Sequence, residues 1–229
     1  YRSHSEVSRL NQTAHLAPVE VEAHLFGLLE LSAQITRDTG GAFDIATGAL
    51  SKTWGFYQRA GRVPTPQERS DAMSRTGTRY LVLDRDKRCV KYLREGLEIN
   101  LGGIGKGYAL DRVAANLQTR WGVSCALLHG GLSSIVALGN VGEPRGWPIA
   151  IRHPWEERPL GTIYLNQRAL GTSAATFQHF DYNGKKLGHL LDPRTGWPAS
   201  GVQQVSVLAD TAAEADALST AFFVLGVEA

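Results

Sequence analysis

A glycine-rich loop in the middle of the chain is the first segment whose residues could carry chemistry. The run Gly102-Gly103-Ile104-Gly105-Lys106-Gly107 follows an expected strand, Leu97–Leu101, and opens an expected helix that reaches Trp121. Glycines at a helix N-terminus let backbone N–H groups converge on an anion, and Lys106 adds a full positive charge there. The loop is not a Walker A loop, because a glycine follows the lysine, and its spacing is not a dinucleotide fingerprint. A tight strand-to-helix turn is the alternative interpretation.

The last expected helix carries a carboxylate and a hydroxyl one turn apart. Asp216 and Thr220 are four residues apart and therefore lie on one stripe of the helix. We expect that stripe roughly opposite an apolar face made of Leu218, Ala221, Phe222 and Leu225. Oxygen ligands of these two kinds suit a hard cation such as Mg²⁺. The alternative is a solvated helix face with no ligand.

A turn near the C-terminus gathers four chemically different side chains within eight residues. Its sequence is His189-Leu190-Leu191-Asp192-Pro193-Arg194-Thr195-Gly196. His189 is suited to act as a general base near neutral pH, and Arg194 is suited to bind a phosphate. A purely structural turn would use Asp192 and Gly196 equally well.

A second glycine turn presents an aromatic ring and a carboxylate. It reads Gly40-Gly41-Ala42-Phe43-Asp44 and would suit a nucleotide base or a ribose. The alternative is a helix cap that leads into a loop.

Helices and paired strands must position these four segments. Helical spacing from Val19 to Asp38 stops at Gly40-Gly41, and a short helix is expected to open at Pro66 and to close at Gly77. The runs Tyr80–Asp84 and Cys89–Leu93 predict a hairpin. Further strands are expected at Ser124–Leu128, Ile135–Leu138, Gly161–Leu165, Phe177–Tyr182 and Val202–Leu208. For the last helix, Thr211 is the expected cap with Glu214 completing a capping box, and Gly226 the expected end. Because hairpins and helices intermix without regular βαβ alternation, we predict one α+β domain.

Composition excludes several classes of protein. The chain has 229 residues, of which 43% are hydrophobic and 20% charged, and this excludes a disordered chain. Lys and Arg number 24 against 22 Asp and Glu, so the net charge of +2 provides no strong field for nucleic acid. No apolar run approaches the roughly 20 residues of a membrane-spanning helix. Two cysteines form neither a disulfide framework nor a zinc site by themselves.

Taken together and in order, these segments resemble the ApbE family, the FAD:protein FMN transferases. Five segments over nearly the whole chain carry the resemblance. They are Ser5-Glu6-Val7-Ser8-Arg9-Leu10-Asn11, Thr39-Gly40-Gly41-Ala42-Phe43-Asp44, Asn100-Leu101-Gly102-Gly103-Ile104-Gly105-Lys106-Gly107-Tyr108, His189-Leu190-Leu191-Asp192-Pro193-Arg194-Thr195-Gly196 and Ala215-Asp216-Ala217-Leu218-Ser219-Thr220. The resemblance implies a single domain related to the T-fold over residues 1–229, with mixed, mostly antiparallel sheets and flanking helices, and without the family's N-terminal segment.

The resemblance also implies a reaction. FAD is cleaved at its pyrophosphate with the help of Mg²⁺, the FMN half is joined through its phosphate to a Thr or Ser hydroxyl of an acceptor protein, and AMP leaves. By the family pattern Asp216, Thr220 and the backbone carbonyl of Gly103 hold Mg²⁺, while the loop with Lys106 binds the pyrophosphate. No nucleic acid takes part.

The remaining roles follow from the same resemblance. His189 is the expected base for the incoming hydroxyl, with Asp192 either orienting it or fixing the turn. The residues expected to contact FAD are Ala42, Phe43, Asp44 and Asn100, with Tyr1 and the backbone near Leu190 as weaker candidates. Family members commonly act at the outer face of the bacterial inner membrane, often as lipoproteins, so the resemblance implies the periplasmic side of the cell envelope.

Three positions depart from the family pattern. Asn100 stands where the family usually has Asp, which removes one charge near the nucleotide. Gly131-Leu132 replaces Gly-Asp, and Thr172-Ser173-Ala174 replaces Thr-Ser-Gly. Two other functions are therefore kept as alternatives: an Mg²⁺-dependent FAD pyrophosphatase that uses water instead of a protein hydroxyl, and a carrier that binds FAD without turnover.

Overall fold

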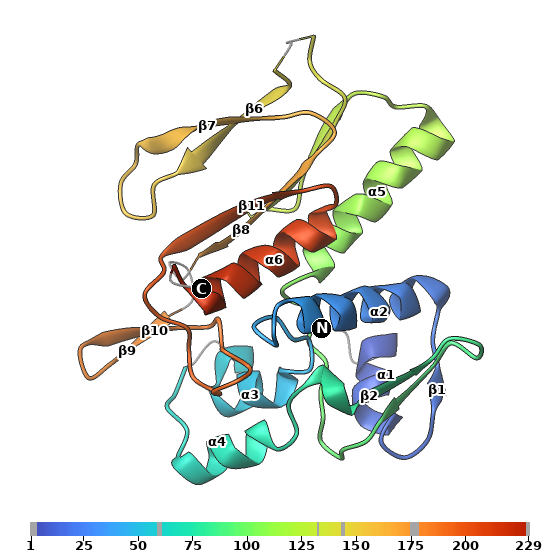
Figure 1. Cartoon of the computed structure of the whole chain (residues 1–229), viewed down its shortest axis with the longest axis vertical. Coiled ribbons are helices and arrows are strands. Elements are labelled where there is room, and N and C mark those ends of the chain that lie inside the picture. Colours follow the sequence, from blue (N-terminus) through green and yellow to red (C-terminus); the bar gives the residue numbers. More distant parts are fainter. Residues whose placement is uncertain (1–3, 59–60, 132, 143–144, 175–178, 228–229) are drawn as a thin grey trace. The chain divides into compact units, whose positions relative to one another are not determined.

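The computed structural model describes residues 4–58, 61–131, 133–142, 145–174 and 179–227. Its contacts gather in two compact units: Tyr1–Leu101 with Gln178–Ala199, and Gly102–Phe177 with Ser200–Ala229. Both units contain helices and antiparallel strands (Figure 1), which confirms the predicted α+β class. Within the described ranges, no helix combines the length and the apolar character needed to cross a membrane.

The first unit is mainly helical in its N-terminal part. Its helices are α1 (Glu6–Thr13), α2 (Ala23–Asp38), α3 (Gly48–Thr53) and α4 (Pro66–Met73), with 3-10 turns at Phe56–Gln58 and Thr78–Tyr80. The predicted helix Val19–Asp38 begins four residues late, because the Glu22 carboxylate caps α2 by accepting from the His24 and Leu25 N–H groups. Pro66 opens α4 as predicted.

Short antiparallel strands complete the first unit. They are β1 (Val19–Glu20), β2 (Leu81–Asp84), β3 (Cys89–Tyr92), β9 (His179–Tyr182) and β10 (Lys185–Gly188). The first three form a sheet in the order β1-β3-β2, and β9 pairs with β10. The β2–β3 pairing confirms the predicted hairpin.

The predicted strand Leu97–Leu101 is wrong, because no strand among the described residues pairs with this segment. Its hydrogen bonds go instead to a helix start and to a side chain. The Gly48 N–H donates to the Glu98 carbonyl at 2.9 Å. In the same segment, the Asn11 side-chain amide donates to the Ile99 carbonyl at 3.0 Å and accepts from the Ile99 N–H at 2.9 Å. One side-chain amide therefore supplies the pair of bonds that a strand would have supplied.

The second unit contains two long helices and most of the strands. Its helices are α5 (Gly105–Trp121) and α6 (Ala212–Leu225). Its strands are β4 (Ala126–His129), β5 (Ser134–Leu138), β6 (Trp147–Arg152), β7 (Pro159–Leu165), β8 (Ala169–Ala174) and β11 (Gln204–Ala209). Four of them form an antiparallel sheet in the order β11-β8-β5-β4, and β6 pairs with β7.

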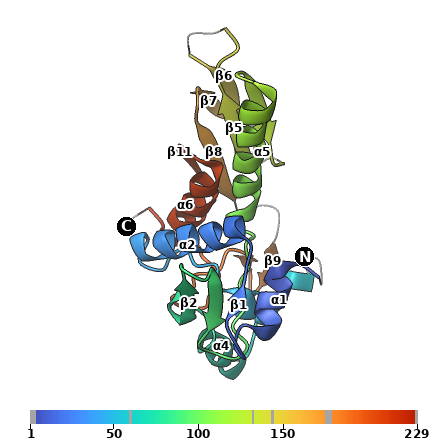
Figure 2. The ribbon, with the colours of Figure 1, turned by 90° about the vertical axis from the view of Figure 1, so that its right-hand side faces the viewer.

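Strand β5 lies in the centre of the second unit and is buried on both faces. Val136 and Leu138 pack against Ala114 of α5 and Ala212 of α6, so these helices cover one face of the sheet (Figures 1 and 2). The alternate residues of β5 pack against the β6–β7 hairpin on the other face. The unit is thus three layers thick, with β5 in the middle layer.

Helix α6 begins and ends where predicted, but its buried surface extends well beyond the predicted apolar face, of which Ala221 is fully buried. Thr211 caps it, although Glu214 completes the cap through the Thr211 hydroxyl rather than through the backbone, and Gly226 follows its last residue. Phe222, predicted to face the core, is 44% exposed, whereas Asp216 is buried. Most residues buried with Asp216 on α6 are small, among them Ala212, Ala213 and Ser219, which lets the helix backbone approach its neighbours closely, and Phe223 is the large side chain buried with them.

We predict that Gly107 is required for this close approach. A Cβ atom at Gly107 would lie 2.0 Å from the Ala212 carbonyl oxygen, so Gly107→Ala forces α5 and α6 apart and lowers the free energy of unfolding by about 3 kcal/mol. Gly27 of α2 is the matched control, because a Cβ there meets nothing within 4 Å and Gly27→Ala should stabilise the protein by about 0.5–1 kcal/mol. Urea denaturation measures both changes. Equal stability of Gly107→Ala and the wild type would contradict the packing described here.

Candidate functional site

The predicted site residues fall into two sets, one in each compact unit. The second unit holds Gly103, Lys106, Asp216 and Thr220. The first unit holds Ala42, Phe43, Asp44, Asn100, His189, Leu190 and Asp192. Tyr1 lies outside the described residues.

Asp216 is the charged residue around which the set of the second unit gathers. Only 5% of its surface is exposed, so it does not lie on a solvated helix face. Its Oδ1 accepts a hydrogen bond from the Ser134 hydroxyl at 2.7 Å, and its Oδ2 accepts one from the Gly107 N–H at 2.8 Å. The Lys106 ammonium group lies 3.9 Å from Oδ2. The structure therefore brings the glycine loop and the last helix together within one unit.

The electrostatics of Asp216 make its carboxylate suited to a cation. Burial raises the pKa of this carboxyl above its ordinary value, because the charged form loses its hydration. The hydrogen bond from Ser134, the charge of Lys106 and the Gly107 N–H act in the opposite direction. A further positive charge beside the carboxylate would favour its ionised form in the same way.

Helix α5 positions two of the three partners of this carboxylate, Lys106 and Gly107. Lys106 and Gly107 lie in the first turn of α5, where N–H groups have no partner within the helix, and Gly103 lies in the turn just before it. One turn further along α5, Asp111 accepts hydrogen bonds from the first two N–H groups of α6, at 2.8 and 2.9 Å. Sequence reasoning missed Asp111, because no local motif connects it to a helix about 100 residues away.

The oxygen donors near Asp216 fit a hard divalent cation such as Mg²⁺. Thr220 Oγ1 lies one turn along α6, 3.2 Å from the Asp216 carbonyl oxygen and 3.2 Å from Ser173 Oγ. Among the described residues, no group of three or more His, Cys, Asp or Glu side chains is placed to hold a metal ion. Mg²⁺ commonly binds through one or two carboxylates together with waters and substrate phosphates, so one carboxylate is compatible with it. Each Asp216 oxygen accepts one of the hydrogen bonds described and keeps a second lone pair.

In the first unit, the glycine turn after α2 is a helix cap. Gly40 and Gly41 have φ angles of 57° and 80°, and the Gly41 N–H donates to the Thr36 carbonyl at 2.8 Å. Ala42 and Phe43 are only 1% and 3% exposed. The turn therefore has a clear structural role, and the side chains of Ala42 and Phe43 are buried rather than presented to solvent.

Asp44 and Asn100 are brought together by backbone pairing. The Asn100 N–H donates to the Ile45 carbonyl at 2.7 Å, which places it beside the residue that follows Asp44. The Asp44 carboxylate accepts from the Thr78 N–H at 2.8 Å and from the Ala46 N–H at 2.7 Å. Burial raises the pKa of Asp44, and these hydrogen bonds oppose the rise. Asp44 thus holds two loops of the first unit in place.

His189 directly follows β10 in a segment that is anchored at several points. The Leu190 carbonyl accepts from the Ala199 N–H at 2.8 Å, and the Trp54 indole N–H donates to the Gly196 carbonyl at 2.9 Å. His189 itself is partly buried. The segment is therefore held at both ends of its turn, as positioning a base requires.

Asp192 closes this turn onto Arg194. Its Oδ1 accepts from the Arg194 N–H at 2.8 Å and from Arg194 Nε at 2.9 Å, and its Oδ2 accepts from Nη2 at 3.0 Å. Of the two roles expected for Asp192, these contacts support fixing the turn. Arg194 contributes to the turn through the same pairing, whereas a phosphate was the partner suggested by its sequence context.

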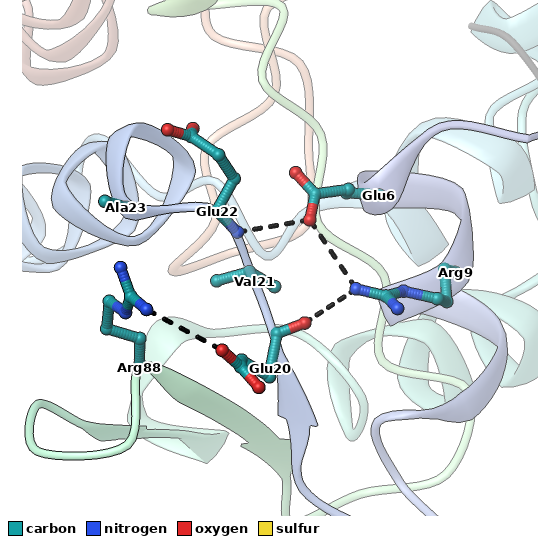
Figure 3. Close-up of a pocket in the computed structure, with 7 residues that line it drawn as sticks. All are labelled: Glu6, Arg9, Glu20, Val21, Glu22, Ala23 and Arg88. Carbon is teal, nitrogen blue, oxygen red and sulfur yellow. Dashed lines mark hydrogen bonds and ion pairs between the residues drawn. The ribbon is translucent and has the colours of Figure 1, made fainter.

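A shallow pocket of charged residues lies elsewhere in the first unit (Figure 3) and contains none of the predicted site residues. It is lined by Glu6, Arg9, Glu20, Val21, Glu22, Ala23 and Arg88. Its charges pair with each other: Arg9 lies 3.5 Å from Glu6, and Arg88 lies 3.7 Å from Glu20. The Glu6 carboxylate also accepts from the Glu22 N–H at 3.1 Å. These bonds join α1 to the start of α2, which is a structural role.

Comparisons with known proteins show the family to which the chain belongs. The model of the ApbE family matches residues 1–229. A FAD:protein FMN transferase of Haemophilus influenzae is 32% identical over 235 residues, covering 99% of this chain and 67% of the relative. One from Escherichia coli strain K12 is 33% identical, covering all of this chain and 66% of the relative.

Solved structures match equally well. The ApbE protein of Thermotoga maritima has a TM-score of 0.90 at 33% identity, covering 98% of this chain and 72% of that one. The flavinyl transferase ApbE of Pseudomonas stutzeri has a TM-score of 0.86 at 30% identity, covering 100% of this chain and 71% of that one. This chain thus spans about two thirds of the length of the curated relatives and has the fold of the solved ones. From the match over its whole length, the chain belongs to the ApbE family.

Proposed function

We propose that this chain is a flavin transferase that cleaves FAD and attaches its FMN half to a hydroxyl group of an acceptor protein. The observation that carries the proposal is the buried Asp216 carboxylate, held beside Lys106 at the N-terminus of α5. A carboxylate that could bind a cation therefore lies beside a helix N-terminus that could bind an anion. A pyrophosphate substrate requires both, because its negative charge must be held and neutralised. The names of the relatives, FAD:protein FMN transferase, support FAD and a protein as the two substrates.

Residues of the second unit would act on the pyrophosphate. The Lys106 ammonium group and the positive N-terminal end of α5 would bind its oxygens and hold the scissile bond in place. The Asp216 carboxylate, the Thr220 hydroxyl and the Gly103 carbonyl would hold Mg²⁺. When bound, Mg²⁺ supplies positive charge that offsets the negative charge developing on the phosphates.

His189 would act as the general base. It would take the proton of the acceptor Thr or Ser hydroxyl while the hydroxyl oxygen bonds to the FMN phosphorus. The bond from that phosphorus to the bridging oxygen breaks, and AMP leaves with this oxygen. Asp192 would contribute by fixing the turn that presents His189.

The flavin nucleotide would be bound in the first unit by the segment around Asp44 and Asn100. Asn100 carries no charge, so it would contribute hydrogen bonds without repelling the phosphates. The backbone near Leu190 and the backbone of Ala42 and Phe43, whose side chains are buried, would add contacts, as would Tyr1. By family resemblance, the reaction would take place at the periplasmic face of the bacterial inner membrane.

One incubation separates this proposal from its alternatives. The chain is mixed with FAD, Mg²⁺ and a Thr-containing flavin-acceptor domain, and the products are followed by mass spectrometry and an AMP assay. A transferase gives an acceptor heavier by FMN together with AMP, and EDTA abolishes both. AMP with free FMN would instead show a pyrophosphatase, and intact bound FAD without AMP would show a carrier.

We predict that Asp216→Ala lowers Mg²⁺-dependent AMP release by at least about 100-fold, because it removes the carboxylate assigned to the cation. The exposed Asp210→Ala is the matched control, since Asp210 precedes α6 and its side chain is 83% exposed in an ion pair with Arg168. The control should release AMP at the wild-type rate. Unchanged AMP release by Asp216→Ala would show that the metal site has been assigned to the wrong residue.

We predict that removing the proposed general base, His189, affects transfer but not FAD binding. His189→Ala should slow transfer by about 100-fold or more, because proton removal from the acceptor is lost, while FAD binding stays measurable. His179→Ala, an exposed histidine on the neighbouring strand β9, provides the control. Single-turnover transfer and a flavin fluorescence titration measure the two quantities. If His189→Ala transfers FMN as fast as the control, His189 has only a structural role.

A further inference from the structure

Ser134 occupies an unusual position for a hydroxyl group. It is the first residue of β5, has no exposed surface, and its Oγ donates to Asp216 Oδ1 at 2.7 Å. Side chains alternate along a strand, so Ser134 faces the same side as Val136 and Leu138, the side covered by α5 and α6. It is therefore a polar residue at the edge of an apolar layer, aimed at a carboxylate.

A glycine on the neighbouring strand makes this contact possible. Gly171 of β8 stands opposite Ser134 in the register, and a Cβ at Gly171 would lie 2.3 Å from the backbone of Ala215. The absence of that Cβ lets α6 approach the sheet closely enough for a short hydroxyl to reach Asp216. The Ser134 backbone is fixed as well, since its carbonyl accepts from the Gly130 N–H at 2.8 Å.

Two donors from different elements hold the two oxygens of Asp216. Ser134 of β5 engages Oδ1, and the backbone of Gly107 in α5 engages Oδ2. Two bonds from separate directions fix the rotation of the carboxylate about its side-chain axis. The remaining lone pairs then have a fixed direction in the metal-free chain.

We propose that Ser134 is a positioning residue that orients the Asp216 carboxylate for a divalent cation. This inference rests on the proposed function, in which Asp216 is a cation ligand. Ligating carboxylates generally depend on such hydrogen bonds from neighbouring groups, and their loss costs about 10- to 100-fold in metal affinity. Without the hydroxyl, Oδ1 would be buried without this donor, and the carboxylate would be free to rotate toward Lys106.

Mn²⁺ affinity of the metal-free chain tests the proposal without relying on turnover. Electron paramagnetic resonance titration with Mn²⁺ alone is made on the wild type and on Ser134→Ala, Ser134→Cys and Asp216→Ala. Ser32→Ala is the matched control, because Ser32 is equally buried but donates to a carbonyl within α2, in the first unit. Circular dichroism monitors folding of each variant.

Ser134→Ala should weaken Mn²⁺ binding by about 10- to 100-fold, with Ser32→Ala unchanged. Ser134→Cys keeps the side-chain shape but is a weaker donor, so its affinity should fall between those of wild type and Ser134→Ala, and it decides the question if Ser134→Ala does not fold. Wild-type affinity in a folded Ser134 variant would overturn the proposal. Wild-type affinity in Asp216→Ala would overturn the metal site itself, and with it the part of the proposed function that depends on that site.

Discussion

The second unit is organised around the burial of one ionised carboxylate. An isolated charge inside a protein is costly unless hydrogen bonds or opposite charges compensate it. Asp216 receives that compensation from the hydroxyl of Ser134 in β5 and from two neighbouring residues of α5, the Gly107 N–H and the Lys106 ammonium group. All three can reach it only because α6 packs backbone against backbone on α5 and β8, at the glycines Gly107 and Gly171. This packing therefore keeps the Asp216 carboxylate inside the unit, close to the N-terminus of α5, where the helix dipole favours anions.

Carboxylates in the first unit have a different task. Asp44 and Asp192 accept hydrogen bonds from nearby backbone and guanidinium groups and so hold irregular segments in shape. Such segments lack strand partners, so side chains must satisfy their backbone groups. The pair of bonds between Asn11 and Ile99 has the same purpose. Acidic residues whose type suggests a catalytic role can therefore have a structural role instead. This does not change the role of general base that we propose for His189.

Local signals in the sequence predicted the start of α4, both ends of α6 and the β2–β3 hairpin, whereas α2 begins later than predicted and α4 ends at Met73 instead of at Gly77. Pro66 and Gly226 act through their backbone geometry and Thr211 through its hydroxyl group, and none of these signals requires knowledge of distant residues. Contacts between residues far apart in the sequence could not be predicted from such local signals. Ser134 and Asp216 are 82 positions apart, and Ser134 belongs to no motif. The burial of α6 was predicted only in part, because hydrophobicity placed Phe222 inward, whereas the small residues Ala212, Ala213 and Ser219 let the side that carries Asp216 pack closely. The five motif segments nevertheless identified the ApbE family, which the match over the whole chain confirms.

The proposed function depends most on the binding of a hard divalent cation by Asp216 and Thr220. A crystal structure of this chain grown with FAD and Mn²⁺, with anomalous diffraction used to locate the metal, tests this binding directly. We expect an anomalous peak within coordination distance of an Asp216 carboxylate oxygen and the Thr220 hydroxyl, and in contact with a phosphate oxygen of FAD. A fully occupied metal bound elsewhere, with Asp216 contacting only Ser134, Gly107 and Lys106, would contradict the proposed binding.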